Sequence, residues 1–184
     1  MPRTIYYTGV SLDGFIADPD DSLDWLTTQD IDPAGAFGYG AFIRDIGALA
    51  MGATTYAWIL DHMSGTGEDW FYEVPTWVFT HREFPALDGA DIRLTRGDVA
   101  PVHAQMAAAA GERDVWVVGG GDLAGQFADR GLLDEVIVSI APVTLGAGAP
   151  LLPRRLDMEL LETARNRAFV AARYAVTREG AAAP

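Results

Sequence analysis

Runs of consecutive apolar residues alternate along this chain with segments in which apolar residues recur at helical spacing. The clearest run lies within residues 115–121, VWVVGGG, where four large apolar residues precede three glycines. An unbroken apolar run of this length is typical of a short buried strand. Leu123, Phe127 and Leu132 follow at helical spacing. The pattern therefore predicts a strand, a glycine turn and a helix over residues 122–130.

The same reading gives the other elements. Segments rich in β-branched, aromatic or other apolar residues predict strands over Thr4–Val10, 48–51, 76–80, 92–94, 135–141, 158–163 and Phe169–Val176. Apolar spacing and capping residues predict helices over 33–46, from Thr54 or Thr55 to Leu60, and over 102–110. Residues 62–70 and 144–150 contain glycine and are expected to be loops.

Strands alternate with helices until the last two strands, which are joined by a short turn at residues 165–167. This order predicts a largely parallel α/β sheet that ends in an antiparallel hairpin, with strand 116–118 at its centre. Three corners, at residues 52–55, 80–82 and 119–121, follow strands, and open α/β sheets bind ligands at that edge. We expect one domain over residues 1–179 and a flexible tail over 180–184.

The loop over residues 11–24 carries three apolar residues, Phe15, Ile16 and Ala17, between turn signals. Such a loop either lies over a ligand or packs its apolar tip on its own domain. The pattern alone leaves both interpretations open.

The charge narrows the possible partners. The chain has 13 basic and 26 acidic residues, a formal net charge of −13. Nucleic-acid binding needs lysine and arginine on one face, so we expect no nucleic-acid partner. An anionic ligand would be held by backbone N–H groups and a few local arginines. No segment is apolar enough to suggest a signal peptide or a membrane span, so we expect a cytoplasmic protein with no membrane partner.

Metal binding is also not expected. The chain has no cysteine, which excludes disulfides and thiolate ligands. Its three histidines, His62, His81 and His103, are far apart and show no metal-ligand spacing.

The glycine corner at residues 119–121 is suited to phosphate. Glycines let backbone N–H groups approach an anion, and a helix N-terminus adds partial positive charge. Residues 119–124 also satisfy the dinucleotide pattern G-x-G-x-x-A. A Rossmann fold would need an acidic residue at the end of the next strand, which here ends in Ala141 and Pro142. We therefore expect phosphate binding but not a Rossmann fold.

Five short motifs, in this order of position, resemble the dihydrofolate reductase superfamily over nearly the whole chain. They are SLDGFIA (11–17), MGATTY (51–56), FTHR (79–82), VGGGDLAGQF (118–127) and PVTLGAGAPLLP (142–153). The first and last are similar to one branch, the reductase (C-terminal) domain of the bacterial bifunctional riboflavin-biosynthesis deaminase–reductase and its stand-alone relatives. The resemblance implies a dihydrofolate-reductase-like three-layer α/β sandwich. The zinc-dependent deaminase activity needs cysteines that this chain lacks.

The resemblance implies NADPH as cofactor and hydride transfer to a pteridine or a 5-amino-6-(phosphoribosylamino)uracil-like small molecule. The residues it implies are Phe15, Ile16 and Ala17 at the nicotinamide; Gly52, Thr54, Thr55, Val118, Gly119, Gly120, Gly121 and Leu123 around the pyrophosphate; and Thr80, His81 and Arg82 at the 2′-phosphate. Ala53 stands where family members often carry a basic residue, so phosphate affinity would depend more on Arg82.

Reduction of a C=N or C=O bond also needs a proton, from a side chain or from water. Folate-reducing members place a carboxylate shortly after a tryptophan, which Trp25 matches here. Asp30 is our candidate, with Asp32 nearby and Asp13 in the SLDG motif as its rival. The alternative for each is a solvated or helix-capping aspartate.

Two functional hypotheses follow. The first is a stand-alone NADPH-dependent reductase, and the second is a non-catalytic NADP(H)-binding sensor or interaction module on the same fold. Relatives implied by the resemblance are commonly dimers. We expect a homodimer that buries apolar residues of the C-terminal hairpin, namely Met158, Leu160, Leu161, Phe169 and Val170.

Overall fold

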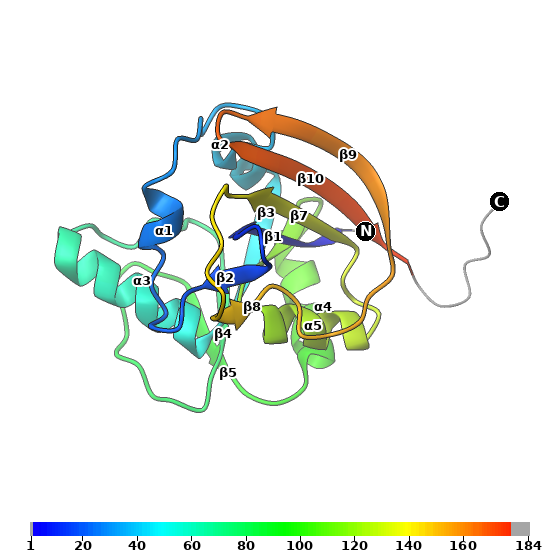
Figure 1. The fold of residues 1–184 in the computed structure, drawn as a ribbon. Helices are drawn as coiled ribbons and strands as arrows, with labels where there is room; N and C mark the ends of the chain where they lie inside the picture. The colour runs from blue at the N-terminus through cyan, green and yellow to red at the C-terminus, as the bar shows by residue number, and fades with distance from the viewer. Residues whose placement is uncertain (1, 178–184) are drawn as a thin grey trace.

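A computed structural model describes residues 2–177, and its main feature is one eight-stranded sheet (Figure 1). The strand order is β5-β4-β3-β6-β1-β7-β10-β9. The bounds are β1 Thr4–Val10, β3 Ile46–Gly52, β4 Thr76–Phe79, β5 Ile92–Thr95, β6 Asp114–Gly119, β7 Glu135–Ile140, β9 Met158–Asn166 and β10 Phe169–Val176. The six strands from β5 to β7 are parallel, whereas β10 and β9 are antiparallel, which confirms the predicted fold class.

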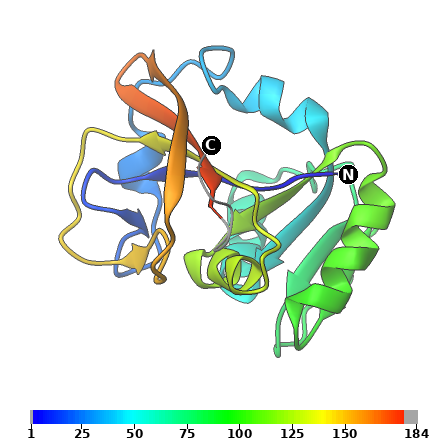
Figure 2. The same cartoon turned by 90° about the vertical axis from the view of Figure 1, so that its right-hand side faces the viewer.

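Helices cover both faces of the sheet, so the fold has three layers (Figure 2). On one face, α4 (Val99–Ala110) and α5 (Gly121–Asp129) pack over β1, β3 and β6. On the other face, α3 (Ala53–Thr66) packs over β3 and β4, and the short elements α2 (Tyr39–Phe42) and η1 (Ile43–Asp45) pack near Trp116. Alternate residues of each strand point to opposite faces, so Ala50 and Met51 join different core clusters.

The central strand β6 is buried as its apolar run predicts. Val117 is fully buried and Trp116 is 5% exposed, and the indole N–H of Trp116 donates to the Tyr7 carbonyl oxygen at 3.0 Å. Val118 is only half-buried, because its side chain lines the groove described below.

Two helix predictions need correction. The helix expected over 33–46 begins only at Tyr39, because residues 33–38 fold into tight turns in which a Cβ on Gly38 would lie 2.2 Å from the Pro33 carbonyl oxygen. The helix expected to start at a threonine cap has Gly52 as its N-cap instead. It also runs past Leu60 to Thr66, so the loop predicted over 62–70 begins only at Gly67, a left-handed C-cap.

The two predicted loops 11–24 and 144–150 meet and pair. Here β2 (Phe15–Ala17) and β8 (Ala149–Pro150) form a small antiparallel sheet, and α1 (Asp24–Thr27) follows. The backbone N–H of Leu12 donates to the Val143 carbonyl at 2.7 Å, and that of Leu151 donates to the Gly14 carbonyl at 2.9 Å. We call residues 11–17 and 143–151 together the β2–β8 ribbon. It lies beside the start of α5.

Five apolar residues of the C-terminal hairpin were expected to be buried in a homodimer, and one of them is not at the surface. Met158, Leu160, Leu161 and Val170 are exposed, between 38% and 55%. Phe169 is 1% exposed and belongs to the interior, so it is not available to a partner. The predicted flexible tail, residues 180–184, lies outside the described residues. No helix within residues 2–177 has the length and apolar character needed to cross a membrane.

Candidate functional site

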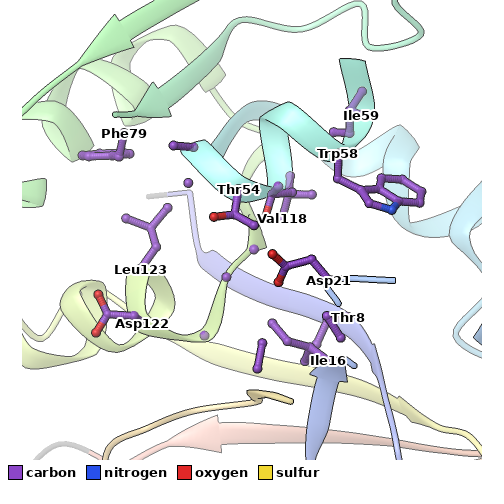
Figure 3. A pocket seen from close by; sticks show the side chains of 18 of the residues that line it. Thr8, Ile16, Asp21, Thr54, Trp58, Ile59, Phe79, Val118, Asp122 and Leu123 are labelled. Carbon is purple, nitrogen blue, oxygen red and sulfur yellow. The ribbon is translucent and has the colours of Figure 1, made fainter. Parts of the chain in front are cut away.

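A groove of about 540 Å³ runs along the edge of the sheet where the parallel strands end (Figure 3). Its size falls in the range of small-molecule sites. The groove is lined by segments far apart in the sequence: the ends of β1, β4 and β6, the starts of α3 and α5, and the β2–β8 ribbon. Their convergence follows from topology, because the carboxyl ends of parallel strands share one edge.

Two helices begin in the wall of this groove. The N-cap of α3 is Gly52 and that of α5 is Gly120, and neither is capped by a side chain. A Cβ on Gly120 would meet only Ile16 Cδ1, at 3.9 Å, and one on Gly52 would meet only backbone atoms of residues 119 and 120, at 3.8 Å. Both glycines therefore leave open space in front of two helix N-termini. Such an arrangement attracts an anion through free N–H groups and the helix dipoles.

The neighbouring glycines have a different reason to lack a side chain. A Cβ on Gly119 would lie 2.9 Å from Thr55 Oγ1, and one on Gly121 would lie 2.2 Å from the Leu151 carbonyl oxygen. Gly119 thus lets β6 approach α3, and Gly121 lets α5 approach the β2–β8 ribbon. Of the three predicted glycines, only Gly120 faces open space in the groove, whereas Gly119 and Gly121 are required by close packing.

Three aromatic side chains, Trp58, Phe71 and Tyr72, line the groove, and we call the part that they line the ring end. The polar residues Thr8 and Asp21 also line the groove. The Phe71 and Tyr72 rings lie 4.5 Å apart, and Tyr72 also packs edge-on against Trp116 at 5.8 Å. Burial raises the pKa of the Tyr72 hydroxyl, so the group stays neutral.

Asp21 was not singled out by the sequence. It sits in a left-handed conformation, with φ of 59°, within a turn closed by a hydrogen bond from its own N–H to the Asp18 carbonyl at 3.1 Å. Asp18 Oδ1 supports the turn by accepting from the N–H groups of Asp20 and Ser22. Figure 3 shows the Asp21 carboxylate directed into the groove.

At the other end of the groove, Phe79 and Leu123 lead toward a second pocket of about 410 Å³. This pocket lies at the ends of β4 and β5 and is lined by Thr80, Arg82, Glu83, Phe84, Leu94, Thr95 and Arg96. Arg96 was missed by the sequence reading. The available signal was its position two residues after the predicted strand 92–94, close to the end of a strand as Arg82 is.

The structure brings most of the predicted cofactor residues together. Those lining the groove are Ile16, Ala17, Gly52, Thr54, Thr55, Val118, Gly119, Gly120, Gly121 and Leu123. Thr80 and Arg82 line the second pocket. Phe15 and His81 line neither of the two. Of the two interpretations of the 11–24 loop, the position of Ile16 and Ala17 favours the one in which the loop lies over a ligand site.

Neither candidate proton donor reaches the groove. The Asp30 carboxylate is exposed and pairs with Arg167 at 3.0 Å. The Asp13 carboxylate accepts from Ser11 Oγ at 2.6 Å and from the N–H groups of Leu145 and Gly146 at 3.0 and 2.7 Å. The Ser11 hydrogen bond, followed by the backbone bonds, lowers the pKa of Asp13 to about 2. Asp13 therefore joins the two halves of the β2–β8 ribbon.

The α5 side of the groove carries an acidic residue, Asp122, that already has partners. Its carboxylate accepts from Gln126 at 2.9 Å and from Arg154 at 2.9 Å, and these bonds lower its pKa. Arg154 also pairs with Asp129 at 2.8 Å. Within residues 2–177 no group of three or more histidine, aspartate or glutamate side chains is placed to hold a metal ion.

Comparison with known proteins gives a consistent result. A family model described as the RibD C-terminal domain matches residues 59–170. The uncharacterised protein YwjB of Bacillus subtilis (strain 168) is 31% identical over 150 residues, which is 81% of this chain and 82% of YwjB.

Two solved structures show the same fold. A Shewanella sp. PV-4 protein with a provisional riboflavin-biosynthesis name is 26% identical, with a TM-score of 0.78, covering 96% of this chain and 99% of that one. The dihydrofolate reductase of Enterococcus faecalis, complexed with NADP(H) and RAB-propyl, is 16% identical, with a TM-score of 0.58, covering 96% of this chain and 97% of that one. At this identity the second likeness concerns the fold alone.

Proposed function

The chain belongs to the RibD C-terminal domain family, and from this membership we propose that it is an NADPH-dependent reductase. It would transfer a hydride to a pteridine or to a 5-amino-6-(phosphoribosylamino)uracil-like small molecule. The solved dihydrofolate reductase with NADP(H) bound shares the fold and supports a nicotinamide cofactor. We further propose that residues 1–179 act as one reductase unit.

One observation carries the proposal: two helix N-termini without side-chain caps face one groove, at Gly52 and Gly120. A pyrophosphate fits this chemistry, because its oxygens accept hydrogen bonds and its charge is stabilised by both dipoles. The space in front of Gly120, where a Cβ would meet only Ile16, accommodates such a group. The residues present therefore suit a dinucleotide.

The residues at the two ends of the groove indicate the orientation in which the dinucleotide would bind. Thr80, Arg82 and Arg96 in the second pocket suit the 2′-phosphate, since arginine forks match phosphate oxygens. Ile16 and Ala17 then lie on the nicotinamide side, next to the ring end. The bound cofactor supplies the hydride and is itself oxidised. The substrate carbon of a C=N or C=O bond takes the hydride, and the nitrogen or oxygen takes a proton from water or a side chain.

The direct test measures binding and turnover separately. NADPH binding is followed by quenching of tryptophan fluorescence, and NADPH oxidation is followed by absorbance with dihydropterin and with 5-amino-6-(5-phosphoribosylamino)uracil as substrates. We expect micromolar binding of NADPH and oxidation with at least one substrate class. Absence of NADPH binding would refute the reductase proposal.

The alternative, a non-catalytic NADP(H)-binding sensor or interaction module, is favoured by one observation. Neither Asp13 nor Asp30, the carboxylates expected to supply the proton, lines the groove. Tight NADPH binding without oxidation by any pterin or aminopyrimidine would support this second function.

We also propose a homodimer formed through the C-terminal hairpin. β9 is an edge strand of nine residues whose other side has no strand partner within the described chain, and Leu160 and Leu161 are 55% and 44% exposed. Exposed apolar edge strands pair readily with other chains. Light scattering should give a dimer mass, and Leu160→Glu should give a monomer, whereas Leu12→Glu, at another exposed leucine, should not. A monomer mass for the unmodified protein at micromolar concentration would contradict the proposal.

A further inference from the structure

Residues 30–45 cross one face of the sheet with almost no core of their own. Within this stretch only Gly38 is buried, and a glycine brings no side chain to the interior. The helical pieces α2 and η1 contain no buried residue. A segment with so few buried apolar side chains opens at a low cost in free energy. Its position therefore depends on the contacts that other parts of the chain make with it.

One of these contacts comes from Asn166, the last residue of β9, which is only 4% exposed. Its amide nitrogen donates to the carbonyl oxygens of Asp32 at 2.9 Å and of Ala36 at 3.1 Å. Its amide oxygen accepts from the backbone N–H of Asp32 at 3.0 Å. Figure 1 shows the turn that follows β9 beside α2. Both amide hydrogens of this buried side chain are therefore used to hold the backbone of a distant segment.

A second side chain holds the same segment one residue further along. The Tyr7 hydroxyl donates to the Phe37 carbonyl oxygen at 2.9 Å. Phe37 has φ of 54°, a left-handed conformation that is unfavourable for a bulky side chain. Such a conformation persists only where surrounding contacts hold it. Asn166 and Tyr7 provide these contacts, because they bond the two peptide groups that flank the Phe37 Cα atom.

The held segment leads directly to aromatic residues behind the ring end. The helix α2 begins at Tyr39, whose ring lies 6.0 Å from that of Trp116. Tyr72, which lines the groove, packs edge-on against Trp116 at 5.8 Å. Burial raises the pKa of Tyr72, and the nearby Tyr39 hydroxyl adds to this rise. A displacement of Tyr39 would therefore remove a neighbour of both Trp116 and Tyr72.

From these contacts we propose that Asn166, which does not line the groove, is a positioning residue for substrate binding at the ring end. Its bonds to residues 32 and 36 keep Tyr39 against Trp116, and Trp116 supports Tyr72 in the wall that a flat substrate ring contacts. Without these bonds only a fraction of the molecules has the complete wall, and the apparent affinity falls by that fraction. The inference rests on the proposed function, because it concerns the substrate of that reductase.

The first experiment separates substrate binding from the chemical step. Asn166→Ala should weaken pterin binding in calorimetry, and raise the KM for the ring substrate that the protein reduces, by about three- to tenfold. The value of kcat and the affinity for NADPH should not change. Arg167→Ala, in the same turn, removes the exposed pair with Asp30 and should leave all four quantities unchanged. Unchanged KM and pterin affinity in Asn166→Ala, or a loss of kcat alone, would overturn the proposal.

A double-mutant cycle tests the route through Tyr39. Tyr39→Ala should weaken pterin binding as Asn166→Ala does, and the two changes together should cost no more than either alone, because they act through the same contact. Additive losses would refute the shared route. Tyr7→Phe removes only the hydroxyl that bonds Phe37, so it should act in the same direction by a smaller factor. Should Asn166→Ala fail to fold, Tyr7→Phe carries the same test.

A local measurement distinguishes positioning from a general loss of stability. Hydrogen exchange over residues 30–45 should be faster in Asn166→Ala, while β3 and β6 keep their protection. Val102→Ala truncates a buried residue of α4, on the other face of the sheet, and should lower the melting temperature without affecting pterin binding. If Val102→Ala weakens pterin binding as much as Asn166→Ala does, the role of Asn166 is general stability and the proposal falls.

The NADPH measurements separate this inference from the proposed function. If the unmodified protein binds pterin but not NADPH, and Asn166→Ala weakens pterin binding, the reductase proposal falls and the role of Asn166 stands. If NADPH is oxidised with the same KM for the ring substrate in both proteins, the reductase proposal stands and this inference falls. If the unmodified protein binds neither pterin nor any other ring substrate, this inference falls as well.

Discussion

Two regions of the groove are built from different parts of the polypeptide. The region between its two ends, where the pyrophosphate is proposed to bind, is made mainly of main chain, because Gly52 and Gly120 open the starts of α3 and α5. The ring end is made of side chains such as Trp58, Phe71 and Asp21, each from a separate segment. A main-chain site is fixed by where strands end and helices begin, so it persists as long as the fold does. A side-chain site can change its ligand by single substitutions that leave the fold intact.

The predicted ligands of these two regions differ for the same reason. Helix N-termini favour anions whatever the neighbouring side chains are, and this suits the pyrophosphate of a dinucleotide. At the ring end the chemistry depends on one carboxylate and on the aromatic walls. Variants that affect one end without the other are therefore the most direct way to test the comparison.

The largest effect is expected from Gly120→Val. Gly120 has φ of −89° and ψ of −177°, an extended conformation that any residue adopts, and its Cβ would point into open groove. The new side chain would occupy the pyrophosphate position and remove at least two hydrogen bonds of about 1.5–3 kcal/mol each, so NADPH affinity should fall by roughly 100-fold or more. Fluorescence titration measures this loss. Gly65→Val, at an open position in α3, should bind NADPH normally.

A contrasting result is expected one residue later. Gly121→Ala would place a Cβ 2.2 Å from the Leu151 carbonyl oxygen, so this variant should lower the melting temperature. Gly120→Val should melt close to the unmodified protein. Equal destabilisation of both variants would contradict the separation of the glycines into groove-facing and packing positions.

The next effect is expected from Arg82→Ala. Loss of a charge-assisted hydrogen bond to the 2′-phosphate should weaken NADPH binding by roughly 10- to 100-fold while barely affecting NADH, which lacks that group. Arg96→Ala should act in the same direction, because Arg96 lines the same pocket. Arg113→Ala removes an exposed arginine elsewhere and serves as control. Parallel losses for NADPH and NADH would remove Arg82 from the 2′-phosphate site.

A smaller effect, confined to the ring end, is expected from Phe71→Leu. Phe71 is 48% exposed, so the substitution should not disturb the core. An aromatic contact contributes about 0.5–1.5 kcal/mol beyond area burial, so pterin affinity should fall roughly two- to tenfold. NADPH affinity, measured on the same protein by calorimetry, should not change. A matching loss of NADPH affinity would mean that the two ends do not bind independently.

A local effect is expected from Asp13→Asn, because Asp13 joins the two halves of the β2–β8 ribbon. The amides of Leu145 and Gly146 should exchange with solvent faster in the variant at neutral pH, while amides of β6 keep their protection. The folded pKa of Asp13, about 2, lies below the ordinary value. The contribution of its ionised form is therefore fully present above the unfolded pKa and is lost as pH falls through about 2. A carboxyl NMR titration with a midpoint near the ordinary aspartate pKa would contradict this role.

No effect on either end is expected from Asp30→Asn. The Asp30 side chain pairs with Arg167 at the surface, and such exposed pairs contribute little. NADPH affinity, ring affinity and turnover should equal those of the unmodified protein. Reduced turnover with unchanged binding would restore Asp30 as a proton donor and would place the reaction elsewhere than the groove described here.

The local features of the fold were predictable from the sequence. The run at residues 115–118 predicted a central buried strand, and the alternation of elements predicted the parallel sheet with its C-terminal hairpin. Both are confirmed by β6 and by the strand order. The sequence did not predict that the helix α2 starts at Tyr39, because the turns of residues 33–38 depend on close backbone approaches such as that of Gly38 to the Pro33 carbonyl oxygen. The motifs at residues 51–56 and 118–127 allowed part of the groove lining to be predicted, because the residues of each motif are contiguous in the sequence.

The ring end was decided only by the tertiary structure. Thr8, Asp21, Trp58 and the adjacent pair Phe71 and Tyr72 come from four separate places in the chain, and no spacing between them repeats a motif. Asp13 and Asp30 were candidate proton donors by their positions in the sequence. In the folded chain the Asp13 carboxylate instead accepts from Gly146 within the β2–β8 ribbon, and the Asp30 carboxylate pairs with Arg167. A sequence determines where its strands end and where its glycines allow backbone to approach, because these depend on near neighbours. Which side chains meet across the groove depends on how distant segments pack, and only the folded chain brings them together.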